Sequence, residues 1–346
     1  MPSVNELLSQ LSDISIHSTD NRNYWMVRTQ DGIRYKPFYE KKIVGMMIPY
    51  IPLSIIPQIN RECNNEKERQ DYVKRYLDNH KDDISIPDPY RSFLSTSANR
   101  STRASQFVNF SFVMKTNDIV VIPSRSSDEI SIGKISGPDL IVDQAITREF
   151  PLARPVDWLK TISKGRLDPN LYRALGAHQA LANISKYAGI IERSYNSCFA
   201  VGENYHYIIS INSDEASAKD LFGLGYNIIE MIEDVSRHFG LDIDSNEIKL
   251  AINLNSPGKI DLKSKFRTIL IAMGIVAALS GGTIKYQGLE IASNGLFDSL
   301  VTEIIRYKEA NQNMQIKQAL FDRYMNSLQV TAVEDTVDRI DEEINP

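Results

Sequence analysis

The spacing of hydrophobic positions changes along this chain, from short β-branched runs in the first half to longer runs of helical period in the second. The runs Ile119–Pro123 and Ile130–Ile135 are rich in Ile and Val, and a polar Ser-Arg-Ser-Ser-Asp segment joins them. Such runs, separated by turn-forming residues, indicate an antiparallel hairpin. Further strand-like segments lie at Tyr24–Thr29, Arg34–Phe38, Ile43–Met47 and Arg154–Trp158, and Asp31-Gly32 predicts a hairpin turn between the first two of these.

Helical periodicity in the first half predicts an amphipathic docking helix within residues 1–20, where Val4, Leu7, Leu8, Leu11 and Ile14 share one face. It also predicts a charged helix over Asn64–His80 and an apolar helix over Ala104–Met114.

Strands and long helices alternate in the second half. Strands are expected at His206–Ile211, Glu247–Leu254 and Thr283–Ile291, and helices at Ser217–Phe239, Leu262–Leu279 and from Asn294 to about Leu328 with an interruption near Asn311. The pattern predicts an α+β fold: an N-terminal β-barrel with helices, followed by a C-terminal α/β domain. The expected division is 1–20 docking helix, 21–160 barrel, 161–198 helical linker, 199–330 α/β domain and 331–346 acidic disordered tail.

The order of the segments YWMVR, TNDIVVIP, ISIGKISG and RPVDWLK resembles the PUA-like superfamily, which includes the EVE and YTH domains. It is most similar to the amino-terminal PUA-like domain of Mrr-type restriction endonucleases. Asn117-Asp118 stands where that group usually has Gly-Asp, and the similarity covers residues 20–160. The resemblance implies a barrel that holds an extruded or modified base in an aromatic cage, in a setting of prokaryotic restriction or antiviral defence.

The cage hypothesis assigns Trp25 as the stacking wall and Tyr24 or Tyr90 as a second wall, with Arg28 also in the pocket. Asp118 would accept a hydrogen bond from an exocyclic amine. The second tryptophan, Trp158, is expected in the barrel core rather than in the cage.

Phosphate contacts are expected from a segment that precedes the apolar helix, where Arg91, Arg100 and Arg103 alternate with Ser and Thr. Hydroxyl and guanidinium groups near a helix amino terminus can hold a phosphate, although the same residues also cap helices and line solvated loops. The expected partner is nucleic acid, DNA rather than RNA, and self-association or a partner subunit is expected through the second domain.

Composition narrows the class of protein. The chain has 346 residues and a net charge of −5, made up of 21 − 20 = +1 over residues 1–160 and 18 − 24 = −6 over residues 161–346. The acidic second half is therefore a poor partner for phosphate.

Cys63 and Cys198 are predicted to be reduced structural thiols of a cytoplasmic protein. We expect no metal site, cofactor or catalytic residue, and the amino terminus lacks the pattern of a signal peptide.

Three alternatives stay open. Thr268–Ile284 runs for 17 residues without a charge, near the lower limit of a membrane span, but Ser280-Gly281-Gly282 shortens the helix to a length that suits a core. A membrane-disrupting effector acting through this stretch is one alternative.

Glu247 and Lys249 have the ExK form of a PD-(D/E)xK nuclease, although the upstream acids Asp242 and Asp244 lie too close to them. In the third alternative the barrel senses a phage protein or a small nucleotide.

Overall fold

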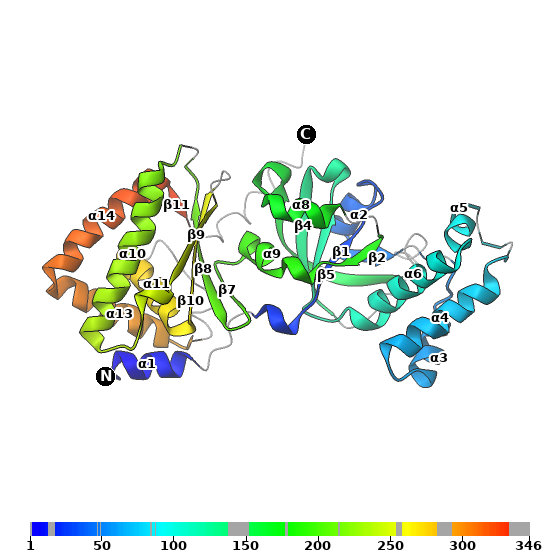
Figure 1. Ribbon diagram of the computed structural model, residues 1–346, viewed down its shortest axis with the longest axis horizontal. Helices are drawn as coiled ribbons and strands as arrows, with labels where there is room; N and C mark the ends of the chain where they lie inside the picture. Colours follow the sequence, from blue (N-terminus) through cyan, green and yellow to red (C-terminus); the bar gives the residue numbers. More distant parts are fainter. Residues whose placement is uncertain are drawn as a thin grey trace. The chain divides into compact units, whose positions relative to one another are not determined.

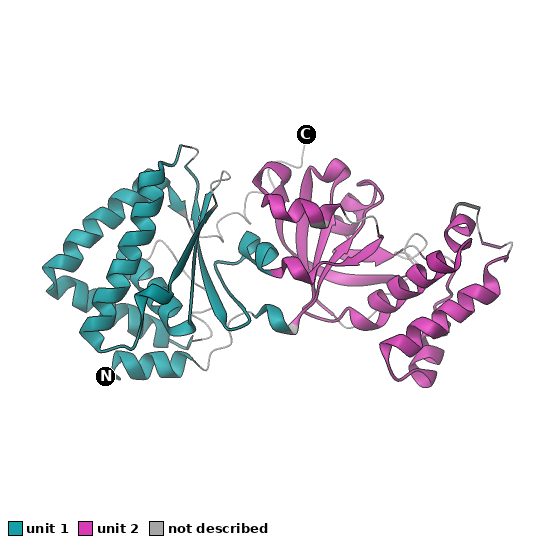
Figure 2. Ribbon diagram, viewed as in Figure 1, with its two compact units in different colours: residues 1–21, 189–346 teal, residues 22–188 magenta. Residues whose placement is uncertain are grey.

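The computed structural model divides the chain into two compact units, residues 22–188 and residues 1–21 with 189–346 (Figures 1 and 2). The structure describes residues 2–12, 18–46, 48, 50–83, 85–86, 88–137, 152–176, 179–213, 215–253, 258–281 and 293–331. The strand expected at Thr283–Ile291 and nearly all of the expected acidic tail lie outside these residues. The fold is α+β, as the sequence predicts.

A curled six-stranded half-barrel sheet forms the centre of the unit 22–188. Its strands are β1 (Tyr24–Val27), β2 (Ile43–Met46), β3 (Ile119–Pro123), β4 (Glu129–Ile135), β5 (Leu152–Ser163) and β6 (Leu181–Asn183), in the spatial order β2-β5-β4-β3-β1-β6. The predicted β3–β4 hairpin is confirmed, with Ile119 opposite Lys134 and Pro123 opposite Ile130. Strands β4 and β5 also pair antiparallel, with a β-bulge beside Gly133.

The hairpin turn predicted at Asp31-Gly32 is wrong. Strand β1 pairs in parallel with β3 and antiparallel with β6, so the segment after it does not return along its edge. Gln30, Asp31 and Gly32 all take positive φ values, and the chain then enters helix α2 (Tyr35–Glu40) instead of a strand. A turn-favouring dipeptide fixes the local bend but not the partner of the strand before it.

A group of helices lies between β2 and β3 in the sequence and packs together. They are α3 (Ile55–Glu62), α4 (Glu66–His80), α5 (Asp88–Arg91) and α6 (Ser97–Val108), which continues as a π-helical turn over Asn109–Val113. Their apolar sides share one core with Trp25, Val120 and Val156 of the sheet. The buried Arg154 of β5 donates to the carbonyls of Phe110 and Ser111, which lie in the π-helical turn.

The segment expected as a helical linker belongs largely to this unit. Strand β6 pairs with β1, and the short helix α8 (Tyr172–Leu175) precedes it. Leu167, Leu171 and Leu181 are buried, so the boundary lies near residue 188 rather than 160. The expected helices are present in part, as α8 and α9 (Ala188–Tyr195), with the strand β6 between them.

The second unit is built on the strands β7 (Cys198–Val201), β8 (Asn204–Ile211), β9 (Lys249–Asn253), β10 (Gly258–Ser264) and β11 (Val330–Thr331). Strand β8 pairs with β10 along one edge, and with β7 and β11 along the other. Its helices are α1 (Val4–Leu11), α9 (Ala188–Tyr195), α10 (Ala218–Phe239), α11 (Phe266–Leu279), α13 (Leu296–Ala310) and α14 (Gln312–Leu328). The predicted interruption at Asn311 is confirmed, because its side chain caps α14.

Helix α11 accounts for most of the uncharged stretch considered as a membrane segment. It spans 14 residues, and nearly all of them are buried under the neighbouring helices and the sheet. Among the described residues, no helix has both the length and the apolar character needed to cross a membrane.

The amino-terminal helix α1 docks on the second unit. Ser3 and Glu6 form a reciprocal capping box, and Leu7, Leu8 and Leu11 enter the core that contains α13. Although α1 precedes the barrel in sequence, its apolar face is buried against helices from the C-terminal half of the chain. Ile14, expected on the same face, lies outside the described residues.

Candidate nucleic-acid interface

Trp25 and Asp118 form a buried pair, not an open cage. Trp25 is 1% exposed and its Nε1–H donates to Asp118 Oδ2 over 2.9 Å. Asp118, which is fully buried, also accepts from the backbone N–H groups of Asn23 and Lys115. A carboxylate that already accepts three hydrogen bonds and an indole enclosed in a core have no surface for a base. The prediction that Trp25 is a cage wall is therefore corrected.

The other proposed pocket residues on β1 are also engaged. Tyr24 is fully buried, and the Arg28 guanidinium donates to the carbonyl of Leu175. Alternation along a strand sends neighbouring side chains to opposite faces, and here both faces of β1 are covered. The sequence alone does not distinguish a fully buried strand from a strand that binds a ligand, because both are rich in aromatic and β-branched residues.

Helix α6 begins earlier than predicted, so two of the proposed phosphate ligands lie inside it. Thr96 caps the helix by accepting from the Asn99 N–H. Arg100 is 9% exposed, donates to Asp78 Oδ1 over 2.5 Å and bonds the Leu94 carbonyl. Hydrogen bonds from Arg100 and Lys74 lower the pKa of Asp78. Arg100 therefore fastens α6 to α4 and is not free for a phosphate.

Tyr90 and Arg103 are brought together through Phe93. The Arg103 guanidinium lies 4.6 Å from the Phe93 ring centroid, and Tyr90 lies 6.1 Å from the same ring. Arg91 donates to the Ile86 carbonyl. These three predicted site residues hold the short helix α5 against α6, in a cluster of their own rather than around Trp25.

A different aromatic group lies partly exposed on the same unit. The rings of Tyr35 and Tyr39 lie 6.3 Å apart at 20°, and those of Tyr39 and Trp158 lie 5.6 Å apart at 18°. All three residues retain some exposure. We call Tyr35, Tyr39 and Trp158 the aromatic ladder. Near-parallel rings that remain open to solvent provide the kind of surface on which nucleobases stack.

Local geometry explains why the ladder forms. Tyr35 and Tyr39 are four residues apart on α2, so they share one face of the helix. Gly133 leaves room for the indole, since a Cβ there would lie 2.6 Å from Trp158 Cε3. The Trp158 Nε1–H donates to the Tyr39 carbonyl over 3.0 Å. Trp158 is thus a partly buried residue that packs against the core of this unit, as expected in part, and is held at the end of α2.

Hydroxyl groups fix the inner end of the ladder. Tyr35 Oη lies 2.7 Å from Ser131 Oγ, which lies 2.8 Å from Thr161 Oγ1. Burial raises the pKa of the Tyr35 phenol, and its hydrogen bonds to Ser131 and Thr161 oppose that rise. Tyr35 is therefore a neutral anchor at the inner end; Tyr39 is the middle ring, and Trp158 is the outer end of the ladder.

Three exposed lysines lie close in sequence to Tyr39. Lys36, Lys41 and Lys42 are exposed, and Lys36 is 3.6 Å from Glu40. Lys42 is tied to β5 because its carbonyl accepts from the Val156 N–H. In the segment Tyr35–Lys42, aromatic and basic residues therefore alternate. This composition is typical of surfaces that bind nucleic acid. A strand over Arg34–Phe38 would hold Tyr35 and Tyr39 too far apart to stack, whereas in helix α2 they lie one turn apart.

The nuclease alternative finds no support in the geometry. Glu247 forms an ion pair with Lys265 over 2.7 Å, and Asp244 accepts from the Asn246 N–H as a local cap. In the described part of the chain, no group of three or more His, Cys, Asp or Glu side chains could hold a metal ion. Two acids and a lysine around a divalent metal are what that chemistry requires.

A buried polar cluster occupies the face of the second sheet that is opposite its main core. His206 Nδ1 lies 2.9 Å from Asp261 Oδ1, and Arg193 of α9 donates to Asp261 Oδ2 over 3.0 Å. The Phe199 ring stacks on His206 at 4.8 Å. The arrangement orients an imidazole but brings no nucleophile beside it, so it fastens α9 to the sheet.

The two cysteines are free thiols in different units. Cys63 is buried, and Cys198 packs against the second core, where burial raises the pKa of its thiol to about 12. A thiol of that pKa is protonated and unreactive at neutral pH.

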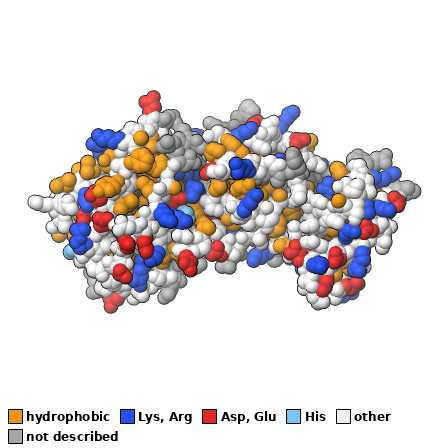
Figure 3. Space-filling model, viewed as in Figure 1, with side chains coloured by type: hydrophobic (Ala, Val, Ile, Leu, Met, Phe, Trp, Pro, Cys, Tyr) orange, Lys and Arg blue, Asp and Glu red, His pale blue; other side chains and the backbone are white. Residues whose placement is uncertain are grey.

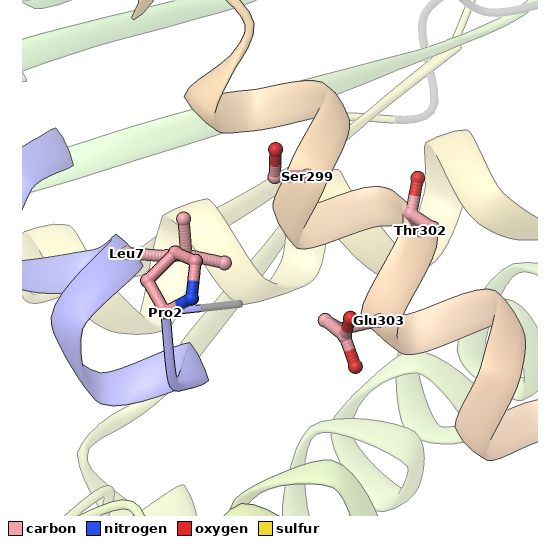
Figure 4. A pocket seen from close by; sticks show the side chains of 5 residues that line it. All are labelled: Pro2, Leu7, Ser299, Thr302 and Glu303. Carbon is pink, nitrogen blue, oxygen red and sulfur yellow. The ribbon is translucent and has the colours of Figure 1, made fainter.

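A cavity of about 270 Å³ lies between α1 and α13 (Figure 4). Pro2, Leu7, Ser299, Thr302 and Glu303 line it, and Glu303 is already paired with Arg306 over 2.6 Å. This lining offers no convergent set of polar groups, so the cavity is a weak candidate beside the aromatic ladder.

Comparison of the chain with protein-family models, with curated proteins and with solved structures finds no match in any of the three.

Proposed function

We propose that this chain binds nucleic acid through the unit 22–188, by stacking a base against Tyr39 and Trp158 while Lys36, Lys41 and Lys42 contact phosphates. The aromatic ladder, partly exposed and next in sequence to three exposed lysines, is the observation that carries the proposal. An unstacked base buries one face against such rings, and each stacked base contributes ~1–3 kcal/mol. The site is thereby moved from the buried Trp25 to the second tryptophan.

The PUA-like resemblance supports the same class of function. A reader of this class takes a base out of its stack, and an extruded or modified base fits a partly exposed platform better than a paired one does. We therefore propose DNA with an extruded or modified base as the ligand, in the restriction or antiviral setting that the resemblance implies. Binding, not catalysis, is the activity proposed.

The charge pattern supports binding at a local patch. The first 160 residues have a net charge of only 21 − 20 = +1, but three exposed lysines fall within the seven residues Lys36–Lys42. Affinity should therefore be modest and strongly dependent on salt. Each lost phosphate contact changes the slope of log K against log salt by roughly 0.7 to 0.9.

The test is a titration of fluorescently labelled oligonucleotides with the full chain, across a salt series. The probes are a single strand, a plain duplex, and duplexes with a mismatch or a modified cytosine. Tyr39→Ala and Trp158→Ala should each weaken binding by about tenfold. Tyr172→Ala is the matched control, because Tyr172 is a 39% exposed aromatic of the same unit outside the ladder.

A lysine series tests the phosphate contacts separately. The triple variant Lys36/Lys41/Lys42→Gln should flatten the salt slope by about 2 to 3, with equal loss for every probe. A matched triple variant, Arg61/Lys67/Lys81→Gln, removes three exposed charges from α3, α4 and the turn that follows. Equal loss in both triples would assign the binding to overall charge and overturn the site. Absence of binding at the lowest salt would overturn the function itself.

A further inference from the structure

One exposed side of α10 has an unusual composition for a helix that is otherwise packed into a core. Phe222 and Tyr226 are 61% and 64% exposed and lie one turn apart. On the neighbouring helix α14, Ile316 and Leu320 are 64% and 38% exposed and also lie one turn apart. Figure 3 shows hydrophobic side chains gathered over this part of the second unit. We call these four residues the α10 patch; an exposed apolar patch of this kind marks an interaction surface.

The α10 patch sits on a firmly built support. Lys317 of α14 forms an ion pair with Asp234 of α10 over 2.7 Å, and Ser327 donates to Asp220 over 2.6 Å. Gly223 allows close approach of the two helices, since a Cβ there would lie 2.6 Å from Tyr324. The two helices are thus fixed to each other, and their outer faces form one rigid surface.

Two opposite charges on the outer side of α10 are placed symmetrically about Tyr226. Lys219 lies seven residues before Tyr226, and Glu233 lies seven residues after it; both are exposed. Seven residues are close to two helical turns, so both residues share the side of α10 that carries Tyr226.

We propose that the α10 patch binds a second copy of this chain, with the two α10 helices antiparallel about a two-fold axis at Tyr226. In that arrangement residues equally far before and after Tyr226 face each other. Lys219 of each copy meets Glu233 of the other, so opposite charges meet on both sides of the axis. A two-fold interface requires a surface that complements itself in this way. The aromatic pair Phe222 and Tyr226 forms the apolar centre.

Charge reversal gives a decisive test, with sedimentation velocity of the full chain at several concentrations as the readout. The wild type should sediment as a dimer. Lys219→Glu places two acids together and Glu233→Lys places two lysines together, so each single variant should weaken dimerisation about tenfold or more. The double variant Lys219→Glu with Glu233→Lys restores both attractions and should recover most of the lost affinity.

Two further variants keep the proposal falsifiable. Phe222→Ser should weaken dimerisation about tenfold or more, whereas Ile33→Ser, at a 71% exposed position of the other unit, should have no effect. Circular dichroism confirms that each variant is folded. A wild type that is monomeric at every concentration, or a double variant no better than the singles, overturns the proposal.

Discussion

The two tryptophans of this chain occupy contrasting places in one sheet. Trp25 is 1% exposed and its N–H ends on the carboxylate of Asp118, in a core that is closed on every side. Trp158 is partly exposed and its N–H ends on the carbonyl of Tyr39, at the end of a surface helix. Both indoles are satisfied as hydrogen-bond donors, so the difference lies in what covers their rings. The comparison shows that a tryptophan in a predicted strand can stabilise the core or be available to a ligand. Its neighbours in space decide between these two roles.

The largest test of this contrast is the free energy of unfolding of the two alanine variants. Trp25→Ala leaves a large cavity in the core and should cost about 3 to 5 kcal/mol. Trp158→Ala removes ring stacking, the hydrogen bond to the Tyr39 carbonyl and part of the packing on the core, and should cost less, about 2 kcal/mol. Denaturant titrations followed by circular dichroism measure both. Equal losses would mean that Trp158 is a core residue and would remove the basis of the aromatic ladder.

The next test concerns the carboxylate under Trp25. Asp118→Ala leaves the Trp25 Nε1–H and the backbone N–H groups of Asn23 and Lys115 without their acceptor, and we expect a loss of about 3 kcal/mol. Asp157→Ala, at an exposed position on β5, should change the free energy of unfolding by less than about 0.5 kcal/mol. A small effect at Asp118 would reopen the possibility that its carboxylate serves a ligand.

The sequence predicts strands better than their partners. The β3–β4 hairpin follows from two Ile/Val runs close together, and the interruption at Asn311 follows from a capping residue between two helical runs. By contrast, β1 pairs with β3 and β6, which are far away in the sequence. Such pairing depends on the whole sheet, and no local signal specifies it.

The site is harder to predict for the same reason. The cage hypothesis assigns Asp118 to a ligand, but only the fold reveals that Trp25 and two backbone N–H groups already donate to its carboxylate. Arg100 was noticed among hydroxyl side chains, but its acceptor Asp78 lies on another helix. Conversely, the aromatic ladder joins residues 35, 39 and 158, and only the return of β5 past α2 brings Trp158 to the two tyrosines.

A smaller effect distinguishes the inner and outer ends of the aromatic ladder. Burial raises the pKa of Tyr35 above its usual value of 10.0, whereas the unfolded chain ionises this phenol at the ordinary pKa. The stability linked to the neutral phenol is therefore fully present below pH 10 and is lost as pH rises from 10 through the raised pKa. Tyr35→Phe should reduce the loss of stability between pH 9 and 11. Thermal unfolding at a series of pH values measures this loss of stability. Tyr39→Phe, at the ring that stacks on Tyr35, serves as the control.

The smallest expected signal is spectroscopic, and it connects the contrast between the tryptophans with the proposed function. Trp158→Phe leaves Trp25 as the sole indole, and its emission should resist quenching by both iodide and caesium because the ring is 1% exposed. Trp25→Phe leaves Trp158, whose ring should be quenched by iodide more than by caesium, because Lys36, Lys41 and Lys42 concentrate anions nearby. Added salt should reduce that preference, and the triple Lys→Gln substitution should remove it. Equal quenching of Trp158 by both ions would show that its surroundings are not cationic, and phosphate would then have no electrostatic reason to approach the ladder.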